Sequence, residues 1–104
     1  MTRRVFYHAD ALAELEALAR QFYGYSTLVG DRFIDTVETV LNRCARFPDS
    51  SPLFYRTLRK ASLSHYAVIL LYAVADDAIT VAAMVEARRN PDALRSLFDS
   101  RLEP

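Results

Sequence analysis

The chain has 104 residues, of which 52% are hydrophobic and 25% charged, a balance typical of a globular protein that excludes intrinsic disorder. We expect residues 1–104 to form a single domain. Thirteen basic and thirteen acidic residues give a formal net charge of zero, which argues against direct DNA binding by the chain alone. The single cysteine, Cys44, excludes a disulfide framework and favours a reducing compartment.

The first half of the chain has the spacing of a strand followed by two helices. Residues 3–8 form a short segment that is partly β-branched and aromatic, which predicts a strand. Apolar residues at three- and four-residue intervals predict a helix over residues 9–23, with Glu14 on its polar face. We expect Gly24 to end this helix, residues 24–27 to form a loop, and Ser26 or Thr27 to cap a second helix that runs to residue 46. So short a loop predicts an antiparallel helical hairpin.

The second half of the chain is rich in strands. Its pattern predicts strands over residues 54–60, 65–75 and 78–87, with a turn at Asp76 and Asp77 and a short helix over residues 92–101. The second and third of these strands are apolar on both faces, which places them inside a sheet. The fold class is therefore α+β. We expect a two-layer domain with an N-terminal strand, an antiparallel helical hairpin, a three-stranded antiparallel meander that completes one sheet, and a short C-terminal helix.

The sequence holds no motif for a cofactor or a metal. GxxxxGK[ST], GxGxxG and HExxH are all absent, and His8 and His65 stand alone, so we expect neither. The longest apolar run, residues 66–75, is about half the length of a membrane-spanning helix. The basic start of the chain is not followed by the apolar segment of a secretory signal. These features predict a cytoplasmic protein without membrane contact.

Three further side chains are interpreted as core residues. Cys44 lies on the apolar face of the second helix, where a free cysteine packs as a small hydrophobic side chain. Tyr66 and Tyr72 share one face of their predicted strand. They are core residues if that face meets the helices and a contact surface if it does not, and burial is the preferred interpretation.

One concentration of basic side chains is a candidate binding site. Its members lie on the first strand of the meander and at the end of the last: Arg56, Arg59, Lys60, Arg88 and Arg89. We expect the hairpin connections to bring them onto one sheet surface as a patch for phosphate or for carboxylates of a partner. The alternative is a solvated strand face with a local salt bridge, such as one between Glu86 and Arg59.

The order of these motifs resembles the RelE/ParE superfamily of type II toxins, and within it the ParE-like branch. The opening VFYHADALAELEAL is similar to the family's first strand and helix, and RFIDTVETVLNRCARFPDSSP to its second helix with the terminal Phe-Pro. The segment YRTLRKASLSHYAVILLYAVADDAITVAAMVEARRNP resembles its three-strand part. Four residues of that segment match the family's pattern. Arg59 resembles its arginine before the central strand, Tyr72 its tyrosine after a β-branched run, and Arg89 with Pro91 its Arg-x-Pro ending.

The resemblance implies a toxin that a co-encoded antitoxin neutralises by forming an oligomer with it. ParE-like members poison DNA gyrase by binding it, whereas RelE-like members cut messenger RNA on the ribosome by acid–base catalysis and charge stabilisation. The residues implied in target or antitoxin binding are Arg56, Arg59, Lys60, Tyr72, Glu86, Arg88 and Arg89. A nuclease would use Arg59, Lys60, Arg88 and Arg89.

Two positions depart from the family's pattern. Glu86 stands where many ParE-like members have histidine, and Ala73 where they often have arginine. A carboxylate at Glu86 would repel a phosphate and could pair with Arg88 or Arg59. Together with the zero net charge, this favours a binding toxin over an endoribonuclease. Two other hypotheses are a weak or inactive toxin and a non-toxic α+β interaction module.

The expected partner follows from the same architecture. A helical hairpin beside a partly apolar sheet leaves a groove for an extended or helical peptide, which commonly folds on binding. Arginine-rich edges would meet acidic side chains of such a peptide. We therefore expect the neighbouring gene to encode a short acidic protein that begins with a DNA-binding segment.

Overall fold

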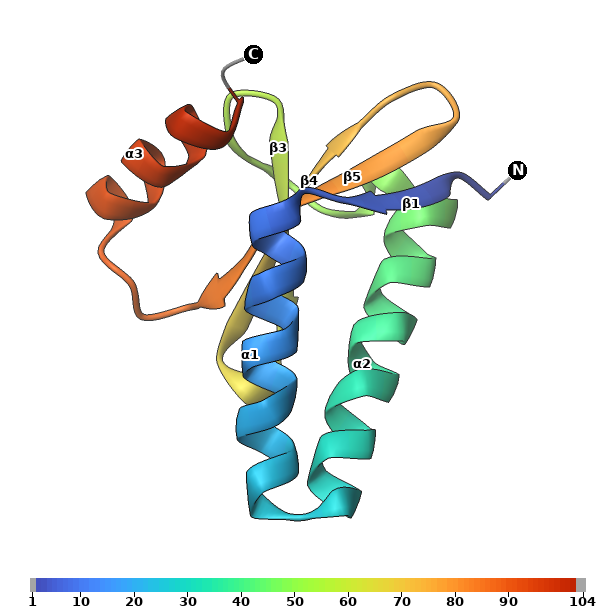
Figure 1. Cartoon of the computed structure of the whole chain (residues 1–104). Helices are drawn as coiled ribbons and strands as arrows, with labels where there is room; N and C mark the ends of the chain where they lie inside the picture. The colour runs from blue at the N-terminus through green and yellow to red at the C-terminus, as the bar shows by residue number, and fades with distance from the viewer. Residues whose placement is uncertain (1, 103–104) are drawn as a thin grey trace.

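The computed structural model describes residues 2–102, which build one mixed sheet with helices on both of its faces (Figure 1). The helices and strands follow in the order β1 (Arg4–Tyr7), α1 (Ala9–Tyr25), α2 (Thr27–Arg46), β2 (Leu53–Tyr55), β3 (Leu58–Leu63), β4 (Val68–Val74), β5 (Ala78–Glu86) and α3 (Pro91–Leu102). Two short 3₁₀ helices, η1 (Pro48–Ser50) and η2 (Ser64–Tyr66), lie between them. The predicted α+β class is confirmed.

The sheet has the strand order β1-β5-β4-β3-β2. The pairs from β2 to β5 are antiparallel, whereas β1 pairs with β5 in parallel, with Arg4 opposite Ala78 and Tyr7 opposite Val81. The apolar strands β4 and β5 are interior, as their sequences predicted. β1 thus lies beside β5, the last strand of the chain, although the helical hairpin and three other strands separate them in the sequence.

The helical hairpin turns at a single residue, Ser26. Its N–H donates to the Phe22 carbonyl and closes α1, while its Oγ accepts the Val29 N–H at 3.1 Å and caps α2. The prediction that Gly24 ends the first helix was wrong, since α1 runs on to Tyr25. A glycine inside a helix costs only about 1 kcal/mol, and Ser26 is the stronger helix cap.

Gly30 lets the two helices approach closely near the hairpin tip. It is buried, and a Cβ added there would overlap atoms of the Tyr23 ring, whose hydroxyl donates to Asp31 Oδ1 at 2.7 Å. Gly30→Ala is expected to lower the free energy of unfolding, measured in urea, by about 1–3 kcal/mol, because the ring must leave its site. Gly24→Ala meets nothing within 4 Å and should raise it by about 0.5–1 kcal/mol. Effects of the same sign at both positions would contradict this explanation.

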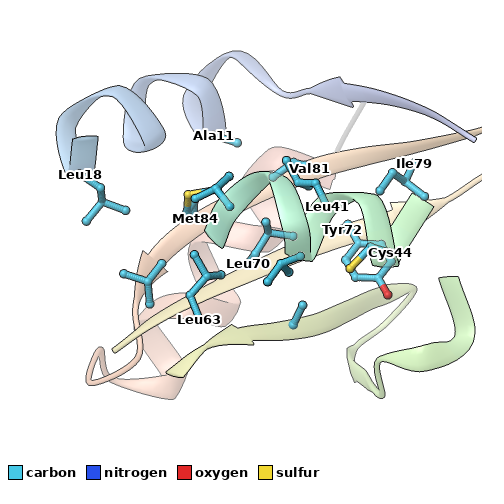
Figure 2. Close-up of a cluster of buried hydrophobic side chains, with 14 of the residues drawn as sticks. Ala11, Leu18, Leu41, Cys44, Leu63, Leu70, Tyr72, Ile79, Val81 and Met84 are labelled. Atoms are coloured by element: carbon cyan, nitrogen blue, oxygen red, sulfur yellow. The ribbon is translucent and has the colours of Figure 1, made fainter. Parts of the chain in front are cut away.

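The sheet carries an apolar core on each face. On the hairpin face, Cys44 of α2 packs with Leu70 and Tyr72 of β4, while Ala11 and Leu18 of α1 lie over β5 (Figure 2). Cys44 and Tyr72 are fully buried, which confirms their prediction as core residues. Tyr66 is half-buried and packs edge-on against Phe22 and Phe33.

The opposite face is covered by α3, which adds a third layer to the two that were predicted. Leu94 and Phe98 of α3 are buried against Leu58, Leu71 and Val85 of the sheet. The extra layer has a clear cause, because β4 and β5 are apolar on both faces and a sheet of that kind needs cover on both.

Two strand boundaries differ from the sequence prediction. Residues 54–60 do not form one strand but the hairpin β2–β3, which turns at Arg56 with a left-handed φ of 53°. The meander therefore has four strands rather than three. β4 begins at Val68 instead of residue 65, because Ala67 also takes a left-handed backbone, with a φ of 50°, and ends η2 there.

Candidate functional site

The predicted basic residues fall at opposite ends of the sheet rather than on one surface. Arg59 lies opposite Tyr72, which lies opposite Val81, whereas Glu86 lies opposite Val68. Val81 and Glu86 are five positions apart on β5, which is about 16 Å along a strand. The prediction of a single patch was wrong because β3 and β5 are each antiparallel to β4. They therefore run in the same direction, and the start of one and the end of the other lie far apart.

Arg59 anchors the loop that follows α2. Its Nη1 donates to the Ser51 carbonyl at 2.7 Å, its Nη2 lies 3.2 Å from Asp49 Oδ1, and its side chain is 22% exposed. Both ends of the guanidinium are thus occupied by the segment around η1. The alternative of a salt bridge between Arg59 and Glu86 is wrong.

Tyr72 holds the same loop from inside the core. Its hydroxyl donates to the Pro48 carbonyl at 2.8 Å, and its side chain is inaccessible to solvent. Burial is the main reason why the pKa of Tyr72 is raised above 10.0. The two residues that the family resemblance marks on β3 and β4 therefore fix residues 48–51, and the Tyr72 ring offers no stacking surface.

Tyr72→Phe is expected to lower the free energy of unfolding by about 1–2 kcal/mol, because the Pro48 carbonyl loses its donor. Since the folded pKa lies above the unfolded value of 10.0, the phenol's contribution is complete below pH 10 and is lost as the pH rises further. Denaturant unfolding between pH 7 and pH 11 should thus show the gap between wild type and variant narrowing above pH 10. A constant gap up to pH 11 would contradict the assignment.

Arg56 and Lys60 lie towards α3 and not towards the helical hairpin. Arg56 Nε is 3.1 Å from Asp99 Oδ1, which also accepts the Tyr55 hydroxyl at 2.9 Å. The Lys60 ammonium lies 5.1 Å from the centroid of the Phe54 ring. These contacts on the β2–β3 hairpin join it to α3 and cover part of the second core.

Glu86, Arg88 and Arg89 gather at the other end of the sheet, and all three are exposed. They border two adjoining hollows between α1 and the end of β5, of about 360 and 220 Å³. We call these together the α1–β5 groove. Residues that line both hollows are Leu18, Gln21 and Glu86.

A buried ion pair that sequence reasoning missed borders the α1–β5 groove, where Glu14 forms part of the lining. Arg101 of α3 donates to both carboxylate oxygens of Glu14, at 2.8 and 3.0 Å. Glu14 also accepts the Met84 N–H at 3.1 Å, and Arg101 also donates to the Ala82 carbonyl at 2.9 Å. Arg101 Nε lies 3.6 Å from Asp10 Oδ2.

The sequence held one signal for this pair. Glu14 was placed on the polar face of its helix, yet it lies three residues after Ala11 and four before Leu18, on the stripe that is buried. Its partner is 87 residues away along the chain, so no local pattern could identify it.

Residues 2–102 contain neither a metal-binding cluster nor a membrane-spanning helix. No group of three or more histidine, cysteine, aspartate or glutamate side chains in this range could hold a metal ion. None of the helices in the same range is long and apolar enough to cross a membrane.

The architecture of this protein is a strand, then a helical hairpin, then an antiparallel meander whose last strand pairs with the first. A chain of the chromosomal ParDE TA system from P. aeruginosa shares it, with a TM-score of 0.68 over 82% of this chain and 96% of that chain at 10% sequence identity. No family model and no curated protein matches the sequence. The resemblance to the ParE-like branch is thus confirmed at the level of the fold.

Proposed function

We propose that this chain is the toxin of a type II toxin–antitoxin system, which binds DNA gyrase in the cytoplasm and is neutralised by a co-encoded antitoxin. The observation that carries the proposal is the fold shared with a chain of a ParDE system, which extends over 96% of that chain. Fold alone is a weak guide to function. The arrangement of the candidate residues adds independent support.

The positions of the basic side chains favour binding over RNA cleavage. Acid–base catalysis needs groups within about 3 Å of the reacting atoms. Arg59 is held by the η1 loop, and Lys60 lies over the Phe54 ring. Arg88 and Arg89 follow the far end of β5. These four side chains do not converge on one phosphodiester, which supports a toxin that is not an enzyme.

The exposed residues at the end of β5 are one of two parts of the predicted site that remain available to a partner. Arg88 and Arg89 stand free of the two cores, and Glu86 lies beside them at the α1–β5 groove. Arg56 and Lys60 border α3 and provide a second, separate basic surface on the other face. We assign antitoxin contact to the first group and target contact to the second.

Induced expression in a bacterial host tests this proposal. Growth should stop, an SOS reporter should rise and plasmids should lose negative supercoiling, and the adjacent gene should restore growth when it is expressed together with this one. Purified gyrase should lose supercoiling activity in the presence of the protein. Arg56→Glu with Lys60→Glu should relieve this inhibition, while Arg32→Glu on the exposed side of α2 serves as the matched control.

Two other results would replace the proposal. Cleaved transcripts, with intact supercoiling and with cleavage lost in an Arg88→Ala and Arg89→Ala double variant, would make the protein a ribosome-dependent endoribonuclease. Unimpaired growth under strong expression, with no effect on gyrase, would make it a non-toxic interaction module.

A further inference from the structure

β5 extends beyond the strand that covers it. β1 pairs with Ala78–Val81 only, and the chain then leaves the sheet at His8 to begin α1. From Ala82 to Glu86, no strand within residues 2–102 lies on this side of β5. An uncovered strand edge is a template for an added strand. In this protein it opens into the α1–β5 groove rather than onto a flat surface.

The hydrogen bonds of the Glu14–Arg101 pair show which backbone groups face that groove. Glu14 accepts the Met84 N–H, so Met84 points its backbone groups away from β4, and by alternation along the strand Glu86 does the same. Glu14 and Arg101 occupy the Met84 N–H and the Ala82 carbonyl. The Met84 carbonyl and the Glu86 N–H therefore form the part of this edge that faces the groove.

This pair of groups selects the direction of an added strand. A residue in a parallel strand donates its N–H to one carbonyl and accepts the N–H that lies two residues further along the neighbouring strand. The Met84 carbonyl and the Glu86 N–H have this spacing. An antiparallel strand would use both backbone groups of Met84 or both of Glu86. The Met84 N–H is held by Glu14, and the Glu86 carbonyl accepts the Arg89 N–H at 3.3 Å. The added strand would thus run in the same direction as β1.

The charges around the groove define the side chains that such a strand carries. The Glu14 carboxylate is neutralised by two hydrogen bonds from Arg101. The remaining charges are one acidic residue, Glu86, and two basic ones, Arg88 and Arg89, which leaves the open end of the groove positive. An acidic side chain is the complement of that end. Leu18, on the opposite wall, offers an apolar contact.

We propose that the antitoxin inserts an extended segment into the α1–β5 groove as a parallel strand beside Met84–Glu86, with an acidic side chain against Arg88 and Arg89. This inference rests on the proposed function, because it takes the protein encoded by the adjacent gene as the occupant. The added strand continues the line of β1 past the point where the chain turns into α1.

The complex of the full chain with the product of the adjacent gene provides the test. Amide hydrogen exchange at Glu86 should slow by about tenfold or more on complex formation, because the N–H becomes hydrogen-bonded. Glu86→Pro removes that N–H without removing a bond to β4, and the dissociation constant should rise about tenfold. Glu86→Ala removes the same carboxylate but keeps the N–H, so the dissociation constant of Glu86→Pro should exceed that of Glu86→Ala by about tenfold.

The charges are tested in the same complex. Arg88→Glu with Arg89→Glu should raise the dissociation constant about tenfold or more, whereas Arg32→Glu on α2 should leave it unchanged. Exchange at Glu86 in the wild-type complex does not depend on whether the proline variant folds. A complex in which this amide exchanges as fast as in the free protein overturns the inference and leaves the proposed function standing. Failure to form any complex overturns the proposed function and this inference with it.

Discussion

Arg101→Met is expected to lower the free energy of unfolding by about 3–5 kcal/mol, because it leaves the Glu14 carboxylate without its partner in a largely buried site. The side chains of Arg101 and Glu14 are 8% and 20% exposed, so water replaces little of what is lost. The substitution also removes the donor to the Ala82 carbonyl and releases the last turns of α3 from α1. Urea denaturation followed by circular dichroism measures the change.

A double-mutant cycle separates the ion pair from other effects of the substitution. Glu14→Gln combined with Arg101→Met should be more stable than Arg101→Met alone, since no unpaired charge remains buried. Arg95→Met is the matched control on the same helix, where the pair with Asp92 is exposed and should contribute less than about 0.5 kcal/mol. Equal losses for Arg101→Met and Arg95→Met would show that the buried pair does not stabilise the fold.

Phe98→Ala is expected to cost about 3–5 kcal/mol of unfolding free energy, the range for truncating a buried aromatic side chain. Phe98 is inaccessible to solvent, and its ring meets Phe54 edge-on with centroids 6.3 Å apart. It is the largest side chain that α3 buries in the second core. Urea denaturation gives the loss, and limited proteolysis shows whether α3 is released first.

Leu97→Ala gives the comparison on the neighbouring position. Leu97 is only half-buried at the margin of the second core, so its truncation should cost less than half as much as that of Phe98. If Phe98→Ala left both the unfolding curve and the protection of α3 unchanged, α3 would not be an integral layer of the fold.

The helices and strands were predictable from the sequence wherever one local pattern dominated. The apolar stripe of α2, from Phe33 to Cys44, gave a helix that runs to Arg46, as the structure has it. The sequence offers Ser26 or Thr27 as the cap of the second helix, and Ser26 has that role in the structure. The predicted loop over residues 24–27 is too long, because Gly24 is a tolerated interior residue of α1 and not its end. The turn at Arg56 carries no glycine, asparagine or aspartate to mark its left-handed backbone.

The candidate site depended on long-range geometry, which the sequence does not encode locally. Hairpin connections predict Arg59 and Arg89 on one sheet surface, but the direction of β3 relative to β5 separates them. Local spacing assigns Glu14 to the polar face of its helix, and the pattern cannot show its partner, which comes from α3 at the far end of the chain. Glu86 and Arg88, for which the sequence suggested a charge pair, both line one groove in the structure.

The one-residue junction at Ser26 constrains how this fold can change in length. Each residue advances a helix by about 100°, so a single insertion or deletion between Ser26 and Phe33 would rotate the buried stripe of α2 out of contact with the sheet. There is no spare loop to absorb such a change. Homologous hairpins of other lengths should therefore differ by about seven residues, two full helical turns, added to both helices at once.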